Sequence, residues 1–211
     1  MLWFFILSLV LLGFLGMALI KKSRSYSANN PSLKNVNDLT KAVKSDLFKL
    51  QFTENAEKYG ERTFQQFEEL EKKYAAYLQT LNQKFNPSEV TYDRYLSPVQ
   101  QVQESLKENF KKLKDITVFI GNNSDQVKRL EKQTNPPLTT EEKGKLEIHK
   151  KYLTYFDDLF SLNQKALNEL DQLTFSLSQV NSNQSQDPKQ IEYLVKELNV
   201  LSDRAKKYSL N

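Results

Sequence analysis

Histidine and cysteine, two residue types common at metal sites and among catalytic groups, are nearly absent from this sequence. The chain of 211 residues has one histidine and no cysteine. Disulfides, thiolate metal sites and cysteine nucleophiles are therefore excluded, and so is any site that needs two imidazoles. His149 is followed by Lys150 and Lys151. Because the further ligands of a metal site are missing, we expect His149 to be a solvated or helix-edge residue.

Asp157 and Asp158 form the most suggestive pair of carboxylates, because a general acid and a general base are often two such groups. Adjacent positions of a helix point about 100° apart, however, so these two side chains cannot easily act on one substrate. The sequence also has no phosphate-binding glycine loop and no G-x-S-x-G motif. We therefore expect a protein that is not an enzyme and that has no cofactor and no metal site.

The elements that must position any site are predicted to be long helices. The chain contains only 5 glycines and 6 prolines, too few for the many turns of an all-β fold. Its charged residues make up 27% of the sequence, which suits helices with solvated outer faces. The predicted fold class is all-α, with one N-terminal transmembrane helix followed by an antiparallel bundle of three to four long helices.

The first twenty residues, MLWFFILSLVLLGFLGMALI, are almost wholly apolar. As a helix they would rise about 30 Å, which is the thickness of the hydrocarbon core of a bilayer. Trp3 would lie at one headgroup region, and Lys21, Lys22 and Arg24 follow the other end. The positive-inside rule then predicts a single-pass membrane protein with the N-terminus outside and the helical domain in the cytoplasm.

A cleaved signal peptide is the alternative for this segment, because Gly16, Met17 and Ala18 offer small residues near a cleavage site. No basic residue precedes the apolar run, which favours an anchor. The predicted organisation is therefore an anchor over residues 1–22, a juxtamembrane linker over residues 23–35 and a helical-bundle domain over residues 36–211.

Four helical patterns are predicted in that domain. They run from Asn37 to Phe85, from Asn86 to Gly121-Asn122, from Thr139 to about Val180, and from Asp187 to Tyr208. Ser97-Pro98 would kink the second helix or begin a new one, and residues 124–133 suggest a further short helix. Thr139 and Glu142 match a capping box. The third helix has the broadest apolar face, so we expect it to be the packing centre.

A cluster of aromatic side chains is the main candidate for a partner-binding patch. Antiparallel packing of the first three helices would gather six tyrosines in one region: Tyr74, Tyr77, Tyr92, Tyr95, Tyr152 and Tyr155. Tyrosines with one solvated end are enriched at interfaces, although they also commonly close the edge of a core.

Charge is concentrated beside the apolar segment. Residues 21–50 carry seven Lys or Arg and two Asp, and the remainder is nearly balanced, which argues against a nucleic-acid partner. We therefore expect a membrane-anchored, non-enzymatic helical adaptor or accessory subunit whose partners are the lipid bilayer and a protein. The alternatives are a homo-oligomeric coiled-coil stalk or tether, and a small-molecule-binding or enzymatic bundle.

The outline of an anchor followed by long helices is similar to that of the LemA proteins and of ATP synthase b subunits. No sequence motif is shared with either, so no residue role is carried over.

Overall fold

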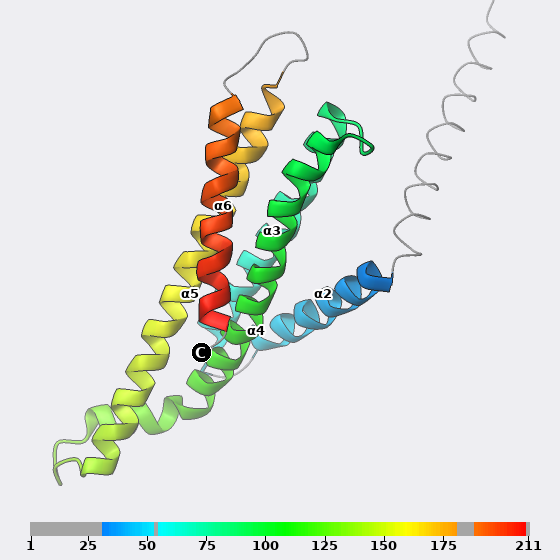
Figure 1. Ribbon diagram of the computed structural model, residues 1–211. Coiled ribbons are helices and arrows are strands. Elements are labelled where there is room, and N and C mark those ends of the chain that lie inside the picture. The colour runs from blue at the N-terminus through cyan, green and yellow to red at the C-terminus, as the bar shows by residue number, and fades with distance from the viewer. Residues whose placement is uncertain (1–30, 53–54, 181–187, 210–211) are drawn as a thin grey trace, which may run out of the picture. The chain divides into compact units, whose positions relative to one another are not determined.

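The structure, a computed structural model, describes residues 31–52, 55–180 and 188–209. These residues form helices joined by turns, and no strand occurs among them, which confirms the predicted all-α bundle. The helices are α2 (Pro31–Leu50), α3 (Glu57–Lys84), α4 (Val90–Lys132), α5 (Thr140–Ser178) and α6 (Pro188–Ser209) (Figure 1).

The predicted anchor, with Trp3, Lys21, Lys22 and Arg24, lies outside the described residues. None of the helices in the described ranges is long and apolar enough to cross a membrane. Helix α2 begins at Pro31, inside the range predicted as a linker. Tertiary contacts divide the chain between Ala42 and Val43, within α2, and the bundle belongs to the part that begins at Val43.

Helices α4 and α5 occupy the centre of the bundle. Each contacts the other, and each also contacts both α3 and α6. Successive helices from α3 to α6 run in alternating directions, as short connections between long helices predict (Figure 1). Helix α5, the third predicted helix, is therefore central as expected, and it shares that position with α4.

The core consists mainly of leucine and aromatic side chains. Phe67 of α3 meets Phe110 of α4 edge to face, with ring centroids 5.2 Å apart. Within each helix, the buried core residues recur every three or four positions, which is the pattern of a helix face turned toward the core. The largest fully buried side chains are Tyr77, Phe67, Phe110, Phe156, Leu47, Leu70, Leu81, Leu106, Leu113, Leu159, Leu167 and Leu170.

One pair of amides interrupts this apolar core. The Nδ2 of Asn109 on α4 donates to the Oδ1 of Asn163 on α5 at 2.8 Å, and both side chains are fully buried. A buried polar group left without a partner costs about 1–3 kcal/mol. This hydrogen bond therefore favours one alignment of α4 along α5.

The prediction of one continuous first helix is wrong, because the helix is interrupted between α2 and α3. The interruption includes Asn55, whose φ of 63° lies outside the right-handed helical region. This interruption allows α3 to pass close to the end of α2. A Cβ on Gly60 would lie 2.4 Å from the carbonyl oxygen of Leu50, so only glycine fits at this crossing.

The predicted end of the second helix at Gly121-Asn122 is also wrong. Helix α4 continues through these residues to Lys132, and it passes through Pro98 without ending. Val127 and Leu130 are each 7% exposed, so the last turns still bury apolar surface. That burial offsets the roughly 1 kcal/mol by which glycine disfavours a helix.

The start of α4 also differs from the expected start at Asn86. Asn86 accepts hydrogen bonds from the backbone N–H and the hydroxyl of Ser88, at 3.0 and 2.9 Å, and so forms a turn before the helix. The helix itself begins at Val90, and the side chain of the preceding Glu89 does not cap it.

The capping box at the start of α5 is confirmed. The Thr139 hydroxyl accepts from the backbone N–H of Glu142 at 3.2 Å, and a Glu142 carboxylate oxygen accepts from the backbone N–H of Thr139 at 2.8 Å. Two N–H groups at the exposed start of a 39-residue helix are satisfied in this way.

Replacing Thr139 by alanine should lower the free energy of unfolding by about 1 kcal/mol, because one of these N–H groups loses its acceptor. Urea unfolding of the full chain in a mild detergent, followed by circular dichroism, measures the change. Thr140→Ala is the control, since Thr140 is an exposed first residue of the helix and not its cap. Equal effects of the two substitutions would show that the cap does not stabilise α5.

Candidate functional site

The residues that could do chemistry do not converge on one site. Asp157 is exposed and pairs with Arg62 at 3.5 Å, and its neighbour Asp158 is also exposed. In the described part of the chain, no three His, Cys, Asp or Glu side chains are placed to hold a metal ion. The two carboxylates are therefore separate surface groups, as their spacing predicts.

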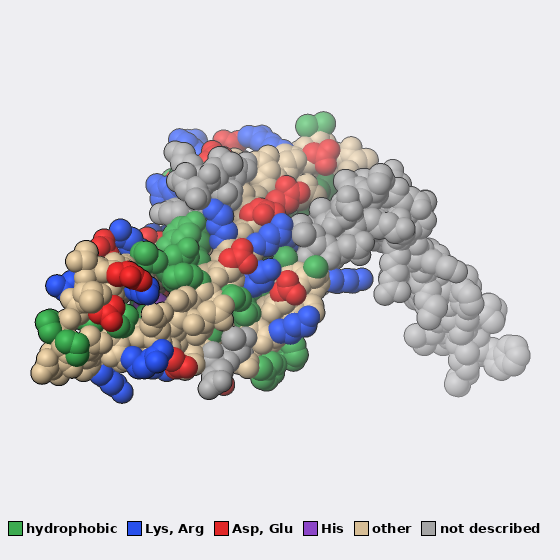
Figure 2. All heavy atoms as spheres, turned by 90° about the horizontal axis from the view of Figure 1, so that it is seen from below, with side chains coloured by type: hydrophobic (Ala, Val, Ile, Leu, Met, Phe, Trp, Pro, Cys, Tyr) green, Lys and Arg blue, Asp and Glu red, His purple; other side chains and the backbone are tan. Residues whose placement is uncertain are grey.

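His149 is buried, with 9% of its surface exposed, so the expectation that it is solvated is wrong. It lies four positions before Leu153 and seven before Phe156, on the face of α5 that packs toward α4. Its Nδ1 has no hydrogen-bond partner among the described atoms. Figure 2 shows hydrophobic side chains exposed among Lys, Arg, Asp and Glu side chains on the face seen from below.

A pocket of about 180 Å³ opens beside His149. Cofactor-sized sites occupy roughly 300–1,000 Å³, so this pocket suits a single side chain better than a cofactor. Its lining mixes apolar groups with amides and one ammonium: Phe119, Asn123, Gln126, Val127, Lys145 and Ile148.

Four of the six predicted tyrosines lie together where α3 ends and α4 begins. Tyr77 is fully buried and donates to the backbone carbonyl of Tyr95 at 2.8 Å, and burial raises the pKa of its phenol. Tyr92 donates to Asn82 at 2.9 Å, and the hydroxyl of Tyr74 is hydrogen-bonded to Gln100. Tyr77 and Tyr95 therefore close the core and offer a partner almost no surface.

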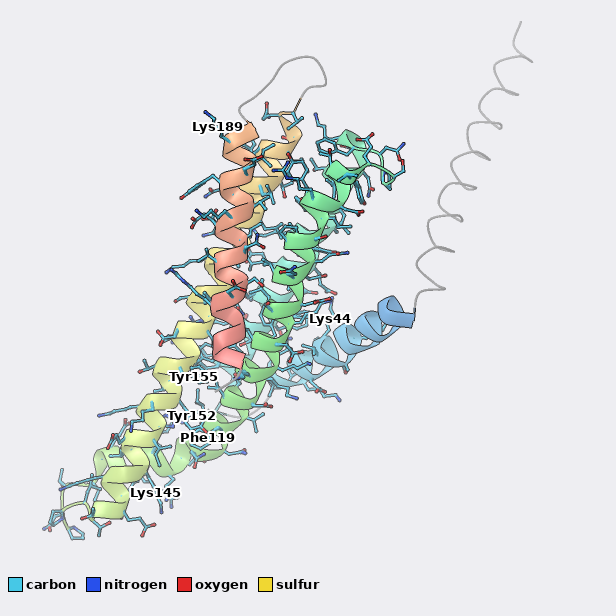
Figure 3. The ribbon with its side chains drawn as sticks, viewed as in Figure 1. Lys44, Phe119, Lys145, Tyr152, Tyr155 and Lys189 are labelled. Carbon is cyan, nitrogen blue, oxygen red and sulfur yellow. The ribbon has the colours of Figure 1, made fainter. Side chains whose placement is uncertain are left out.

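Tyr152 and Tyr155 lie in a different part of the bundle. The ring of Tyr152 stacks on Phe119, with centroids 3.9 Å apart, and the Tyr155 hydroxyl is 3.5 Å from the Nζ of Lys112. Figure 3 shows both tyrosines below the last turn of α6. The expectation that all six tyrosines share one region is therefore wrong.

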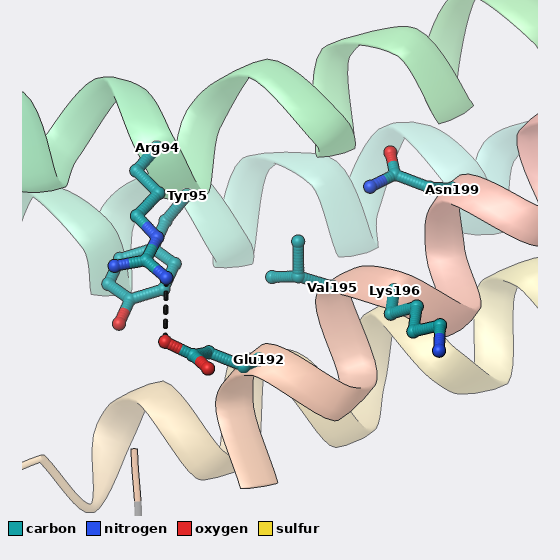
Figure 4. Close-up of a pocket in the computed structure, with 6 residues that line it drawn as sticks. All are labelled: Arg94, Tyr95, Glu192, Val195, Lys196 and Asn199. Atoms are coloured by element: carbon teal, nitrogen blue, oxygen red, sulfur yellow. Dashed lines mark hydrogen bonds and ion pairs between the residues drawn. The ribbon is translucent and has the colours of Figure 1, made fainter. Parts of the chain in front are cut away.

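A second pocket, of about 200 Å³, lies between α4 and α6 (Figure 4). Arg94 and Glu192 form an ion pair of 2.6 Å at its edge, and Val195, Lys196 and Asn199 complete one wall. The paired charges largely cancel, and both side chains are more than half exposed. The pocket is therefore a shallow gap beside a surface ion pair and holds no converging set of reactive groups.

Lys107 is the one buried residue among the Lys, Arg, Asp and Glu side chains whose burial the structure describes. Burial lowers the pKa of its ammonium, while Glu104 and Glu71 act in the opposite sense. Glu71 also binds Lys44 of α2 at 2.6 Å. Lys107 therefore belongs to a network of charges that joins α2, α3 and α4, which is a structural role.

The most exposed aromatic group surrounds the break between α2 and α3. Phe48 lies edge-on to Phe52 and to Phe64, with ring centroids 5.4 and 5.6 Å apart. Phe48 is 51% exposed and Phe52 is 74% exposed. We refer to these three residues as the Phe48 cluster. Clustered aromatic rings that remain in water commonly mark a site of interaction.

Basic side chains accompany the Phe48 cluster. Lys49 is exposed on the same helix, and Lys44 pairs with Glu68 and Glu71 of α3. Sequence reasoning missed the cluster, because the pattern Val43, Leu47 and Leu50 accounts for the buried face of the helix. The available signal was that Phe48 and Phe52 are four positions apart and lie off that face.

Comparison of the chain with protein-family models, with curated proteins and with solved structures finds no match. The described side chains themselves are therefore the basis for a functional proposal. Among them, the Phe48 cluster is the surface whose chemistry departs most from that of an ordinary solvated helix.

Proposed function

We propose that this chain is a membrane-tethered helical bundle that binds a protein partner at the cytoplasmic membrane surface and is not an enzyme. The Phe48 cluster is the observation that supports partner binding, because it leaves two phenylalanine rings in water. The tether is residues 1–22, whose apolar length and basic flank suit a membrane anchor.

The partner in this proposal offers an apolar groove with carboxylates at its rim. Phe48 and Phe52 would enter the groove, since buried aromatic anchors supply most of the affinity at interfaces of this kind. Lys49 would face the carboxylates, because it is exposed next to Phe48 on the same helix. Charges at a rim speed association more than they strengthen it.

A stalk in which the helical stripes are shared between chains has less support. The apolar stripes of α3, α4 and α5 include many of the fully buried residues within one chain, such as Leu70, Leu106 and Leu167. Side chains already packed in this way have no apolar surface left for a coiled coil with other chains.

The anchor can be tested by fractionation of the full chain. We expect the protein to stay in the membrane pellet through high salt and alkaline carbonate, because a spanning helix is released only by detergent. Deletion of residues 1–20 should move the protein to the supernatant. Release of the full chain by carbonate would contradict the anchor and leave the question of a partner open.

Partner binding can be tested by substituting one ring. After mild detergent extraction, the full chain should co-purify with a stoichiometric protein, and Phe52→Ser should reduce its recovery at least tenfold by removing an anchor side chain. Phe175→Ser is the matched control, since Phe175 is 67% exposed on α5 and lies outside the Phe48 cluster. Equal loss with both variants, or no stoichiometric protein with the unmodified chain, would contradict the proposal.

A further inference from the structure

One face of α5 is buried along the C-terminal half of the helix and exposed to solvent along the N-terminal half. Leu162, Ala166 and Leu173 on this face are 8%, 2% and 0% exposed. Ile148 lies about four helical turns before Leu162, so it points in nearly the same direction, yet it is 48% exposed. Figure 3 shows Lys145, three positions before it, beyond the last turn of α6. Helix α4 lines the pocket on one side of Ile148, and the other side of this residue is open.

The open face has a specific order of side chains, which we call the α5 stripe: Glu141, Gly144, Ile148 and Lys151. Their spacings of three, four and three place them along one side of the helix. A Cβ at Gly144 would meet no atom within 4 Å, so the space beside this residue is open, and the missing side chain lets a neighbouring chain approach the helix backbone, which we call the notch. The stripe therefore presents an acid, a notch, an apolar knob and a base in sequence.

The α5 stripe is complementary to the same stripe of a second copy when the two α5 helices run in opposite directions. If Ile148 of one stripe lies on Gly144 of another, the same register places Ile148 of the second on Gly144 of the first. Glu141 of each copy then lies opposite Lys151 of the other. A two-fold axis near the level of Leu146 generates both sets of contacts, as an isologous interface requires.

We propose that the α5 stripe binds the same stripe of a second copy of this chain, antiparallel, as the interface of a homodimer. The charges at each end are available for such a contact. Within one chain Glu141 pairs with Lys145 at 2.8 Å and Lys151 with Glu147 at 2.9 Å, and the side chains of Glu141 and Lys151 are 79% and 72% exposed. Each can take a second partner without leaving the first.

A second copy fits this stripe better than an unrelated helix does, because one register satisfies the knob, the notch and both charges at once. A parallel pairing would place Glu141 on Glu141 and Lys151 on Lys151, which is repulsive. The α5 stripe shares no residue with the Phe48 cluster. The dimer therefore does not depend on the proposed partner or on the membrane anchor.

Exchange of the two charges tests the register. Glu141→Lys and Lys151→Glu should each weaken dimerisation about tenfold, because two symmetry-related contacts become repulsive. The double variant should recover to within about threefold of the unmodified chain, because the exchanged charges at the two positions again attract each other across the interface. Sedimentation equilibrium of the full chain in a density-matched detergent measures the dissociation constant.

The double variant loses both intrachain pairs, so recovered dimerisation would not come from a more stable helix. Ile148→Lys should weaken the dimer at least tenfold, and Val200→Lys on α6 should not, although Val200 is also partly exposed at 37%. The proposal is overturned if the double variant binds no more tightly than the single variants. It is also overturned if the unmodified chain stays monomeric up to about 500 μM.

Crosslinking tests the antiparallel direction directly, because the chain has no native cysteine. One tagged copy would carry Gly144→Cys and a differently tagged copy Ile148→Cys. We expect a disulfide between the two different copies, since opposing core positions bring Cα atoms to within about 7 Å. Crosslinks only between identical copies would indicate parallel pairing and overturn the proposal.

Discussion

Phe156→Ala should lower the free energy of unfolding by about 3–5 kcal/mol. The ring is fully buried in the bundle. Tyr59 meets it edge-on with centroids 5.0 Å apart, and Phe160 stacks beside it at 6.0 Å. The guanidinium of Arg62 lies 5.4 Å from the ring centroid. Alanine would remove these contacts and leave a cavity where α3 crosses α5.

Phe175→Ala provides the matched control, because the same atoms are removed from a ring that is 67% exposed on the same helix. We expect its effect to stay within about 0.5 kcal/mol. Urea unfolding of the full chain in a mild detergent, followed by circular dichroism, compares the two variants. Equal losses of unfolding free energy would show that the first half of α5 is not packed against α3. Helix α4 alone would then be the centre of the bundle.

Gly60→Ala should destabilise the protein, although alanine favours helix formation. The new Cβ would lie 2.4 Å from the carbonyl oxygen and 2.6 Å from the carbonyl carbon of Leu50, and backbone atoms cannot rotate away. The two helices would have to separate, and overpacking of this kind costs about 1–3 kcal/mol after the gain in helix propensity is counted.

Gly144→Ala should have the opposite sign. A Cβ at Gly144 would meet nothing within 4 Å in a single chain, so alanine should stabilise α5 by about 0.5–1 kcal/mol. Denaturant unfolding of both variants at a concentration where the chain is monomeric makes the comparison. If Gly60→Ala stabilises the protein as much as Gly144→Ala does, α2 does not pack against the start of α3.

Local signals in the sequence were sufficient where a helix begins through its own side chains. Thr139 and Glu142 satisfy each other's backbone N–H groups, so their spacing alone predicts the start of α5. The broad apolar face that follows likewise predicts a helix with several neighbours, which α5 has. These features depend on residues within a few turns of one another.

Features that depend on distant residues could not be predicted in this way. Gly121 was expected to end α4, but Val127 and Leu130 continue its buried face and outweigh the cost of one glycine. Gly60 looks like a weak position within a helix, whereas its real constraint is the backbone of Leu50. The burial of Val127 depends on the neighbouring α5, and the constraint on Gly60 comes from α2; a single sequence reveals neither neighbour.

The candidate surfaces were harder still to predict, because they depend on how far each helix extends along its neighbours. The tyrosines of α3 and α4 lie together as expected. Tyr152, however, lies beside Phe119, which is in the C-terminal half of α4. The Phe48 cluster exists because α2 and α3 are separate helices that bring Phe64 against Phe48. These surfaces can therefore be predicted only if the ends of the helices are predicted correctly.

The amide pair in the core has a mechanical consequence. A slide of α5 along α4 by one turn, about 5.4 Å, would break the one hydrogen bond of this pair, and the Nδ2 of Asn109 and the Oδ1 of Asn163 would then lack partners, as the other polar atom of each amide already does. Leaving these polar groups unpaired costs about 1–3 kcal/mol for each group, and this free-energy cost opposes sliding of one helix along the other. A pull along α5 would therefore have to overcome this cost, in addition to the loss of packing, before α5 could slide along α4.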